Sequence, residues 1–544
     1  MKQLIGDKVD RRRFLKGSAM AATGIAAVGL VGCGDDDGGS ETASSPGPSG
    51  SPPSSGSRQG GTLTFSLGGV AVGDPDSLDP IVTGFTPNSM NFLHGVFDSL
   101  WDFDENLNLR PGLAESFELV DDTTVIFQLR QGIEFHDGTP FNAEAVRQHI
   151  LRAQDASTNS NVVSLLSPIE RVEAPTADRV QLTLNRAFSP LLYILADKAG
   201  MIGSPAAVEQ AGEGFGQRPV GTGAFKFVEW VPSDHITLER NPRYWQQGQP
   251  YLDRIIYRNI PDSGQQINLL LGGELQLVFG TPAIPGARVP ELSANSDFVL
   301  QTKQATQFNT WFFNYQRPPF NDPDVREAMN WAIDREELVE GVLFGQGGVI
   351  QGPIPAFHPF FNESLRGFEP KADLEKARAA LSRAGLADGF SFVGVSGNGQ
   401  QDTQRLVLLQ EQLNRIGVEL KIQQLDVTGA YRQALSGDFD AYIQQWSGRV
   451  ALWETFSAIW QSTGGYNFGK IADAELDGLI ARASETYEED EQRELFQQAE
   501  QRIVDLRLNV FDYFTAFTSV ARKEVTNFRL WGEGKSRFNE VSLA

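Results

Sequence analysis

The chain has 544 residues, a formal net charge of −23 at pH 7 and a single cysteine, Cys33. This length is enough for two or three packed domains. The acidic balance excludes nucleic acid as a partner, because its binding requires a basic surface, and one cysteine excludes an intrachain disulfide and a thiolate metal site.

Two targeting signals occupy residues 1–33. Three consecutive arginines and Phe-Leu-Lys, at 11–16, precede a weakly apolar run over 17–32, and Leu-Val-Gly-Cys ends at Cys33. The first resembles a twin-arginine export signal, and the second resembles a bacterial lipobox, whose cysteine is lipidated and becomes the new N-terminus. The apolar run is too short and too rich in Gly and Ala to span roughly 30 Å of hydrocarbon. We predict a cleaved signal peptide and a lipid anchor at Cys33 on the extracytoplasmic face of the cell membrane, with a single-pass anchor as the alternative.

A flexible linker is predicted over 34–59. This segment has no apolar residue larger than alanine or proline, so burial cannot repay the cost of ordering it. Random-coil scaling gives it a span of very roughly 30 Å, which would hold a globular body away from the lipid surface. Residues 1–32 carry six basic and two acidic residues, so their removal would leave a charge of −27. That charge argues against adhesion of the globular surface to anionic lipid.

Alternating apolar and polar residues predict strands in the first half of this body. These strands are expected at 62–67, 125–129 and 180–184.

Helices and strands alternate in the second half. Asp322 before Pro323 is typical of a helix start, and Asp334 three residues before Glu337 is typical of a capping box. Two further helices, each closed by a glycine, and two strands are predicted at 373–384, 406–416, 418–422 and 439–446. The order helix, glycine, strand, helix, strand favours an α/β lobe with a largely parallel sheet.

A series of motifs then carries a family resemblance. The longest reads Phe-Gln-Leu-Arg-Gln-Gly-Ile-Glu-Phe-His-Asp-Gly-Thr-Pro-Phe over 127–141 and continues as Asn-Ala-Glu-Ala-Val over 142–146. Further motifs lie at 113–117, 221–225, 240–245, 319–320, 325–328, 332–335 and 467–468. Together they resemble the family-5 extracellular solute-binding proteins, the peptide, nickel and opine receptors of ABC importers. The similarity covers residues 60–544, and its many collinear motifs make it specific.

The resemblance implies both a fold and a function. The fold is α/β and periplasmic-binding-protein-like, with two hinged lobes and an inserted third domain as in dipeptide receptors. The function is that of an extracytoplasmic solute-binding protein, a monomer without cofactor or catalysis, which delivers a small solute to the permease and ATPase subunits of an ABC importer. The predicted domains are lobe I at 60–95, 216–300 and 512–544, the inserted domain at 96–215, and lobe II at 301–511.

By position against the family pattern, the resemblance places solute-binding residues on two walls of a cleft between the lobes. One wall includes Thr83, Phe85 and Thr86, in the loop after the first strand. Another includes Trp311 and Asn314, where the chain crosses toward the second lobe. Packing inside a buried strand is the alternative for Trp311.

A tryptophan-rich loop completes the predicted site. Where dipeptide and oligopeptide receptors of the family commonly carry Asp-Pro, whose acid fixes the peptide's amino terminus, this chain has Ala451-Leu452, and Glu454 is the candidate substitute. Arg449 can pair with a solute carboxylate in bidentate geometry. Trp446 and Trp453 can stack on a planar, sugar or alkyl surface. A core position for Trp446 and a surface position for Arg449 are the alternatives.

Two rival functions remain compatible with export. An exported hydrolase is disfavoured, because neither Gly-x-Ser-x-Gly nor His-Glu-x-x-His occurs, and because the adjacent His136 and Asp137 are typical of a turn rather than a catalytic pair. The Gly-x-x-x-x-Gly-Lys stretch ending at Lys470 has Ile471 where a phosphate-binding loop needs Ser or Thr. A lipoprotein that senses a solute for a receptor shares every feature described so far.

The identity of the solute stays open among peptide, glutathione, opine, sugar and metal chelate. The five histidines are scattered, with none at ligand spacing to another, so no protein-held metal is predicted.

Overall fold

The computed structural model describes residues 59–69, 73–84 and 87–544. The signal peptide, Cys33 and nearly all of the linker lie outside the described residues, as do Phe85 and Thr86, so everything said of them above stays a prediction. In the described part, no helix combines the length and the apolar character needed to cross a membrane.

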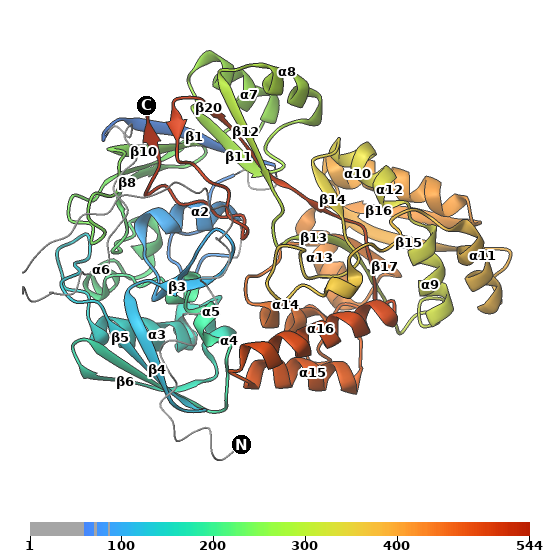
Figure 1. Ribbon diagram of the computed structural model, residues 1–544, viewed down its shortest axis with the longest axis horizontal. Helices are drawn as coiled ribbons and strands as arrows, with labels where there is room; N and C mark the ends of the chain where they lie inside the picture. The colour runs from blue at the N-terminus through green and yellow to red at the C-terminus, as the bar shows by residue number, and fades with distance from the viewer. Residues whose placement is uncertain (1–58, 70–72, 85–86) are drawn as a thin grey trace, which may run out of the picture. The chain divides into compact units, whose positions relative to one another are not determined.

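A seven-stranded mixed sheet is built from segments that lie far apart in the sequence (Figure 1). Its strand order is β12-β20-β11-β1-β10-β9-β8. The central strand β1 pairs in parallel with β10 and β11, and the other pairs are antiparallel. The strands are β1 Thr62–Gly69, β8 Phe225–Val231, β9 His235–Arg240, β10 Arg254–Arg258, β11 Leu277–Thr281, β12 Phe298–Lys303 and β20 Phe517–Arg522.

Both faces of this sheet are apolar, because successive side chains of a strand point to opposite faces. In β11, Phe279 packs with Phe65 and with the buried face of α2. Its neighbour Val278 packs on the other face with Ile267 of α7. The helices are α2 Pro87–Val96, α7 Ser263–Gly272 and α8 Val289–Ala294, with the 3-10 turn η4 Gly286–Arg288.

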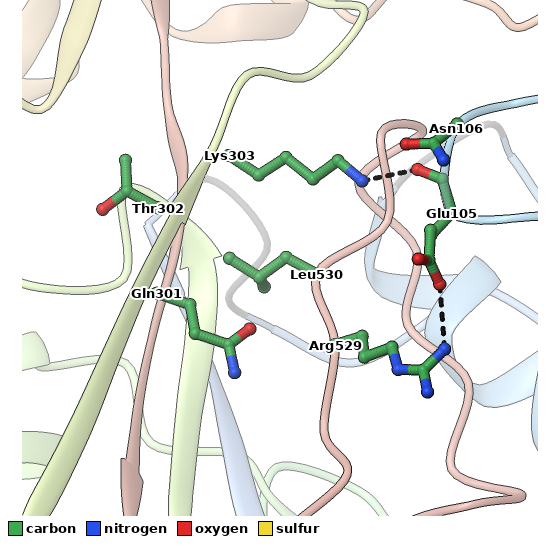
Figure 2. Close-up of a pocket in the computed structure, with 7 residues that line it drawn as sticks. All are labelled: Glu105, Asn106, Gln301, Thr302, Lys303, Arg529 and Leu530. Atoms are coloured by element: carbon green, nitrogen blue, oxygen red, sulfur yellow. Dashed lines mark hydrogen bonds and ion pairs between the residues drawn. The ribbon is translucent and has the colours of Figure 1, made fainter. Parts of the chain in front are cut away.

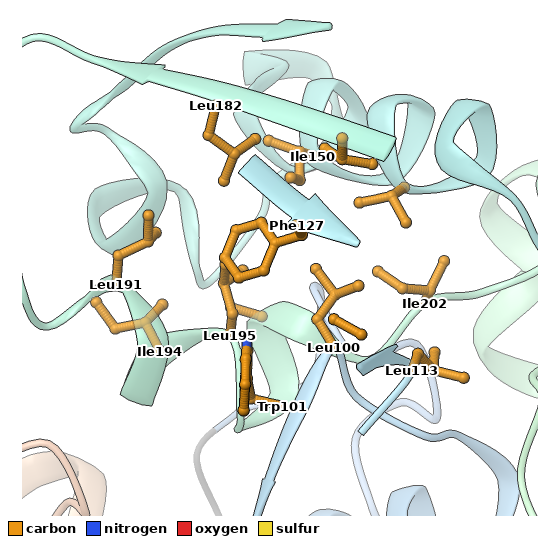
Figure 3. Packing of buried hydrophobic residues seen from close by; sticks show 14 of the residues in the cluster. Leu100, Trp101, Leu113, Phe127, Ile150, Leu182, Leu191, Ile194, Leu195 and Ile202 are labelled. Carbon is orange, nitrogen blue, oxygen red and sulfur yellow. The ribbon is translucent and has the colours of Figure 1, made fainter. Parts of the chain in front are cut away.

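A four-stranded antiparallel sheet follows the order β4-β5-β7-β6. Figure 3 shows its core, in which Phe127 and Leu182 meet Ile150 of the covering helix α3. Asn142 caps α3 by accepting a hydrogen bond from the Ala145 N–H, as an N-cap residue should. The elements are β4 Ala114–Asp121, β5 Thr124–Leu129, β6 Ile169–Thr176, β7 Arg179–Leu184 and α3 Ala143–Gln154.

Short elements surround this sheet. They are β2 Trp101–Phe103, β3 Leu109–Pro111, η1 Ala156–Thr158, α4 Val163–Leu166, α5 Leu191–Ile194, η2 Lys198–Gly200, α6 Pro205–Ala211 and η3 Gly212–Gln217.

The predicted turn at His136 is confirmed. Gly138 has a φ of +88°, and Asp137 Oδ1 accepts a hydrogen bond from the Thr139 N–H at 2.9 Å. His136 Nε2 lies 2.9 Å from the carbonyl oxygen of Gly223. Each side chain is therefore held by a hydrogen bond to a group other than its neighbour, and the charges of the two are only the last cause of each other's pKa shift.

A five-stranded sheet follows the order β16-β15-β17-β13-β18. The expectation of a largely parallel sheet holds for β15 with β16 and β17, but both pairs that β13 makes are antiparallel. The reason is that β13 enters directly from β12 of the seven-stranded sheet instead of through a helical crossover. The strands are β13 Phe308–Phe313, β15 Phe390–Gly397, β16 Val418–Leu425, β17 Ala441–Trp446 and β18 Asn509–Phe511.

Helices cover both faces of this sheet (Figure 1). The first group, α9 to α12, packs on the face that contains Trp311, and α13 to α16 pack on the face that contains Phe312. The helices are α9 Pro323–Ala332, α10 Arg335–Leu343, α11 Leu374–Arg383, α12 Gln400–Asn414, α13 Val427–Ser436, α14 Leu452–Ile459, α15 Ala474–Glu485 and α16 Glu489–Asp505, with η5 Glu363–Leu365.

The predicted helix caps are confirmed, with one difference. Asp322 caps α9, and Asp334 caps α10 by accepting from the Glu337 N–H. The second half of the capping box is replaced, because the Asp334 N–H donates to Gln412 Oε1 at 3.0 Å and Glu337 accepts from the Gln412 amide at 2.9 Å. Gln412 of α12 therefore joins the start of α10 to its neighbour.

Two further strand pairs complete the described fold. They are β14 Gly347–Val349 with β19 Tyr513–Thr515, and β21 Val525–Thr526 with β22 Ser542–Leu543. The predicted domain boundaries stay a prediction; strand β12 continues the seven-stranded sheet to Lys303, beyond the expected start of lobe II.

Candidate functional site

Trp311 lies in the core and not on an accessible wall. Its side chain is fully buried among the apolar residues between β13 and the first helix group. The indole Nε1 donates to Asp512 Oδ2 at 3.1 Å, and Asp512 is also the partner of the buried Arg405. The prediction that Trp311 lines a solute cleft has no support from this position, because both faces of β13 are covered.

Asn314 also has a structural position. Its Nδ2 donates to the carbonyl oxygens of Gly437 and Phe439, each at 3.0 Å, and its Oδ1 accepts from the Gln316 N–H. These bonds hold the turn after β13 against the turn after α13.

Thr83 is fully buried and joins two segments. Its hydroxyl donates to Asp76 Oδ1 at 2.5 Å. Its carbonyl oxygen accepts from Lys198 Nζ, also at 2.5 Å. Thr83, from the first predicted wall of the cleft, therefore contacts Lys198, which was not among the predicted site residues.

Trp446 ends β17 and is almost completely buried. Its indole donates to Thr455 Oγ1 at 3.2 Å, and its ring meets Tyr466 edge-on with centroids 5.2 Å apart. The Arg449 guanidinium carbon lies 5.2 Å from the Trp446 ring centroid, within cation–π range. Trp446 therefore supports Arg449 from the core side.

Arg449 and Glu454 face each other across the start of α14. Arg449 Nε and Glu454 Oε2 are 4.0 Å apart, and the two side chains are 16% and 10% exposed. Arg449 also donates to Ser447 Oγ and to the Gly448 carbonyl oxygen. The surface position that the sequence left open for Arg449 is not observed.

The 3-10 turn η2 contributes a second charged pair near Arg449 and Glu454. Asp197 precedes the turn and accepts from Lys535 Nζ at 2.6 Å. Lys535 also lies 3.4 Å from Glu533. Lys198 is fully buried and, as described, donates to the Thr83 carbonyl oxygen.

These residues act on one another electrostatically. Burial raises the pKa of Glu454 to about 7, opposed by Arg449 and, more weakly, by Lys535 and Lys198. Burial lowers the pKa of Lys198 to about 7, opposed by Asp197, while Arg449 and Lys535 lower it further. We call Asp197, Lys198, Arg449, Glu454 and Lys535 the charge cluster. It joins the loop before α14, the C-terminal segment and residues from the range 96–215, predicted as the inserted domain and called the inserted segment below.

Sequence reasoning found only Arg449 and Glu454 of this cluster. Asp197 and Lys198 precede Arg449 by about 250 positions and Lys535 follows Glu454 by 81, and no motif connects them. One signal was available: Asp197-Lys198 is the only charged pair in the apolar stretch over 190–202, and a buried charge in such a stretch needs a reason.

A second group of charges borders the cluster. Arg537 pairs with Glu533 and with Asp102, the latter at 3.0 Å, and its guanidinium carbon lies 4.4 Å from the Trp531 ring centroid. Burial, followed by Arg537 and Lys535, holds the pKa of His94 well below its usual value. His94 is therefore neutral near pH 7.

Figure 2 shows a separate polar hollow of about 450 Å³, at the end of β12. Lys303 Nζ donates to the Glu105 carbonyl oxygen at 2.5 Å, and Arg529 pairs with the Glu105 carboxylate at 3.0 Å. The hollow contains none of the predicted site residues. Its lining residues are Glu105, Asn106, Gln301, Thr302, Lys303, Arg529 and Leu530.

Trp453 lies beside the charge cluster, on a narrow crevice. The crevice, of about 20 Å³, has room for about one water molecule. It is lined by Val450 to Trp453 together with Pro190, Tyr193, His358, Phe360, Gln492 and Phe496. The Trp453 ring meets Phe188 edge-on at 4.8 Å. Trp453 thus contacts the inserted segment directly.

The described residues contain no group of three or more His, Cys, Asp and Glu side chains arranged to hold a metal ion.

Comparison with known proteins now assigns the family. The family model for bacterial extracellular solute-binding proteins, family 5, matches residues 108–468. The chain belongs to this family. It is the solute-binding component of an ABC importer, and the resemblance seen in the motifs is confirmed.

Curated relatives agree over long stretches. The glutathione-binding protein GsiB of Pectobacterium atrosepticum is 28% identical over 488 residues, covering 87% of this chain and 93% of that protein. GsiB of Escherichia coli is 32% identical over 361 residues, covering 66% of this chain and 69% of that protein. These relatives are binding proteins, and they give no support to an exported hydrolase.

Solved structures confirm the predicted fold class. The periplasmic binding protein DppA of Helicobacter pylori, in complex with the peptide STSA, superposes with a TM-score of 0.76 at 23% identity, over 89% of this chain and 98% of that chain. AgaA of A. tumefaciens R10, in complex with agropinic acid, has a TM-score of 0.75 at 24% identity, over 89% and 99%. The fold is that of a dipeptide-receptor-type periplasmic binding protein.

Proposed function

We propose that this chain is a lipid-anchored receptor for a peptide-like solute that carries at least one carboxylate and one amine. It delivers this solute to the permease and ATPase subunits of an ABC importer. The observation that supports the proposal is the charge cluster, in which Arg449 and Glu454 bring opposite charges together in a nearly buried place. A solute with both charges can satisfy both side chains at once.

Each side chain has a chemical role in this proposal. Arg449 binds the solute carboxylate, for which its planar guanidinium fits better than a lysine. Glu454 binds the solute amine, in the place of the aspartate that peptide receptors of the family carry. Trp453 covers the apolar part of the solute, as a half-buried indole beside both charges.

The names of the relatives support this chemistry. Glutathione, which gives the GsiB proteins their name, is a tripeptide with two carboxylates and one amine. The departure from Asp-Pro at Ala451-Leu452 changes the position of the acid but leaves an acid nearby. Glutathione and short peptides are therefore the first solutes to test.

A thermal-shift screen tests the proposal. The probes are glutathione, di- and tripeptides, opines, oligosaccharides and metal chelates. A true ligand at about 100 times its Kd adds roughly 2.7 kcal/mol to the free energy of unfolding, so the midpoint rises. Stabilisation by sugars or chelates alone, with every peptide and glutathione silent, would show the solute class to be wrong.

Variants assign the two charged roles. Arg449→Ala and Glu454→Ala should each weaken binding of the strongest peptide-like hit, because each leaves a solute charge without its partner. Arg383→Ala, at an exposed arginine that pairs with Asp324 and Glu327, is the control and should leave affinity unchanged. Full affinity in Glu454→Ala would exclude Glu454 as the amine site.

The lipid anchor needs its own test. In cells, Cys33→Ser should move the exported chain from the membrane fraction to the fluid outside the cytoplasm, since the acyl chains are lost. Retention of the variant in the membrane fraction would instead support a spanning N-terminal segment.

A further inference from the structure

A loop that packs on the five-stranded sheet also contacts two distant segments of the chain. It runs over 350–362, between β14 and η5, and Phe357 lies near its middle. A Cβ placed on Gly532, in the segment after β20, would lie 2.8 Å from the Phe357 ring and 3.4 Å from the Leu107 side chain. The two apolar side chains therefore converge on Gly532, whose lack of a side chain leaves room for both.

The loop is anchored on the side of the five-stranded sheet. Ile354 and Phe360 are buried in the same apolar cluster as α14 and α16. Glu500 of α16 accepts a hydrogen bond from the Ile354 N–H at 2.9 Å through Oε1, and Pro355 follows, which restricts the backbone. Phe357 thus extends from a stiff stem, and little conformational entropy is lost when its ring makes a contact.

Leu107 lies on the other side of the contact, in a strained turn between β2 and β3 of the inserted segment. Its φ is +67°, a conformation that leucine rarely adopts and that persists only where the surrounding structure supports it. Asp104 Oδ1 gives this support by accepting from the N–H groups of Asn106 and Asn108 at 2.8 and 2.9 Å. Strain of this kind is typical of ligand clamps, which points to a function for the contact.

The contact borders the charge cluster. Val450 and Trp453, the chain neighbours of Arg449 and Glu454, belong to the same apolar cluster as Phe357. The crevice beside Trp453 is also lined by residues of this loop. Apolar side chains in this position exclude water from the charges, and exclusion of water strengthens the interaction of the charges with a solute.

We propose that Phe357 is a latch residue: its ring, packed on Gly532 beside Leu107, holds the loop against the C-terminal and inserted segments while a solute is bound, and it slows release of the solute. This inference rests on the proposed function and adds how the site retains its solute. Hinged lobes that separate would break this contact, because its two sides belong to different parts of the fold.

Release rates of glutathione test the latch in the complete chain. Stopped-flow tryptophan fluorescence gives both rates, since Trp453 and Trp531 lie nearby in the fold. Phe357→Ala should release glutathione about tenfold faster, with an association rate within about twofold of the native value, because the latch forms after the encounter. An unchanged release rate would overturn the inference.

Phe361→Ala is the matched control. Phe361 is a half-buried residue of the same loop, as Phe357 is, but its ring lies 4.9 Å from the Arg366 guanidinium carbon instead. Both rates should stay at their native values in this variant. Equal acceleration of release in the two variants would show that the loop as a whole, and not the Phe357 contact, affects the solute, which contradicts the latch.

Gly532→Ala tests the surface on which Phe357 packs. Gly532 has no positive φ, so its backbone accepts alanine, and the new Cβ meets the far end of the Phe357 side chain. Release should be faster in this variant, and in Phe357→Ala the same change should add nothing. Gly478→Ala, with nothing within 4 Å of the Cβ position, should leave release unchanged. Additive effects of the Gly532 and Phe357 changes would overturn the inference.

Thermal midpoints separate a latch from a contact that only stabilises the fold. Phe357→Ala should lower the midpoint more in the presence of saturating glutathione than in its absence, because the contact is made fully only in the bound state. A fall of equal size under both conditions would mean that the ring takes no part in retaining the solute.

The inference and the proposed function fail in different ways. Native binding of glutathione with unchanged release in Phe357→Ala overturns the latch and leaves the proposed function standing. If glutathione does not bind but another compound of the screen does, the same rates are measured with that compound. Failure of every compound of the screen to bind the native chain overturns both.

Discussion

Glu454 and Lys198 both belong to the charge cluster, and burial brings the pKa of each side chain to about 7. For Glu454 this is a raised value, because the folded state disfavours the carboxylate. A carboxyl group of this kind contributes stability below its unfolded pKa and loses it as the pH rises through the folded pKa. The protein should therefore lose stability between about pH 4.5 and pH 7.

Glu454→Gln tests this directly. The amide cannot ionise, so the variant should gain stability relative to the native chain as the pH rises from 5 to 8, by about 1 to 3 kcal/mol. Thermal midpoints of both proteins at four pH values measure the difference. Glu209→Gln, at an exposed glutamate of α6, should show no such trend. A constant difference between native chain and Glu454→Gln across this range would contradict the raised pKa.

At the scale of elements, the site depends on the loop between β17 and α14. Gly448 has a φ of +68°, and a Cβ there would lie 2.3 Å from the Thr306 carbonyl oxygen. The loop therefore packs directly on the segment between β12 and β13, and only glycine allows this approach. Arg449 takes its position from this contact.

Gly448→Ala should displace the loop, lower the thermal midpoint and weaken solute binding severalfold. Gly437→Ala is the matched control, because Gly437 has a φ of +75° but nothing within 4 Å of its Cβ position. It should cost only the backbone penalty of about 1 kcal/mol and leave affinity unchanged. Equal affinities in the two variants would show that the loop's close packing does not position the site.

For the whole molecule, contacts between the inserted segment and the helices of the five-stranded sheet matter most. Ser189 donates its N–H to the Ser484 carbonyl oxygen at 2.8 Å, and its hydroxyl accepts from Gln492 of α16 at 2.8 Å. Phe188 meets Trp453 beside these bonds. Such contacts are those that hinge closure on a solute would form or break.

Gln492→Ala should weaken solute binding about twofold to tenfold, since it removes the hydrogen bond from Gln492 to Ser189 across this contact. Gln497→Ala, on the same helix, removes a bond to the Phe361 carbonyl oxygen at 3.0 Å instead and should leave affinity unchanged. Titration calorimetry compares the two. An unchanged affinity in Gln492→Ala would mean that these contacts do not contribute to the bound state.

Local sequence patterns predicted the helices and strands well, because interactions between residues close together in the chain determine them. Asp322 and Asp334 cap their helices as expected, and the period-two pattern beginning at Thr62 is β1. The direction of β13 was not predictable in this way, because it depends on which sheet the preceding strand joins. The full burial of Trp311 could not be decided from the sequence for a related reason: whether helices cover both faces of a strand is a tertiary property.

The sequence by itself determined the family, the α/β elements and two of the five residues of the charge cluster, since each is encoded by residues close together in the chain. Only the tertiary structure decided that Asp197, Lys198 and Lys535 meet Arg449 and Glu454. These residues are separated by up to 338 positions, and electrostatic proximity depends on distance in space, which spacing along the chain does not contain.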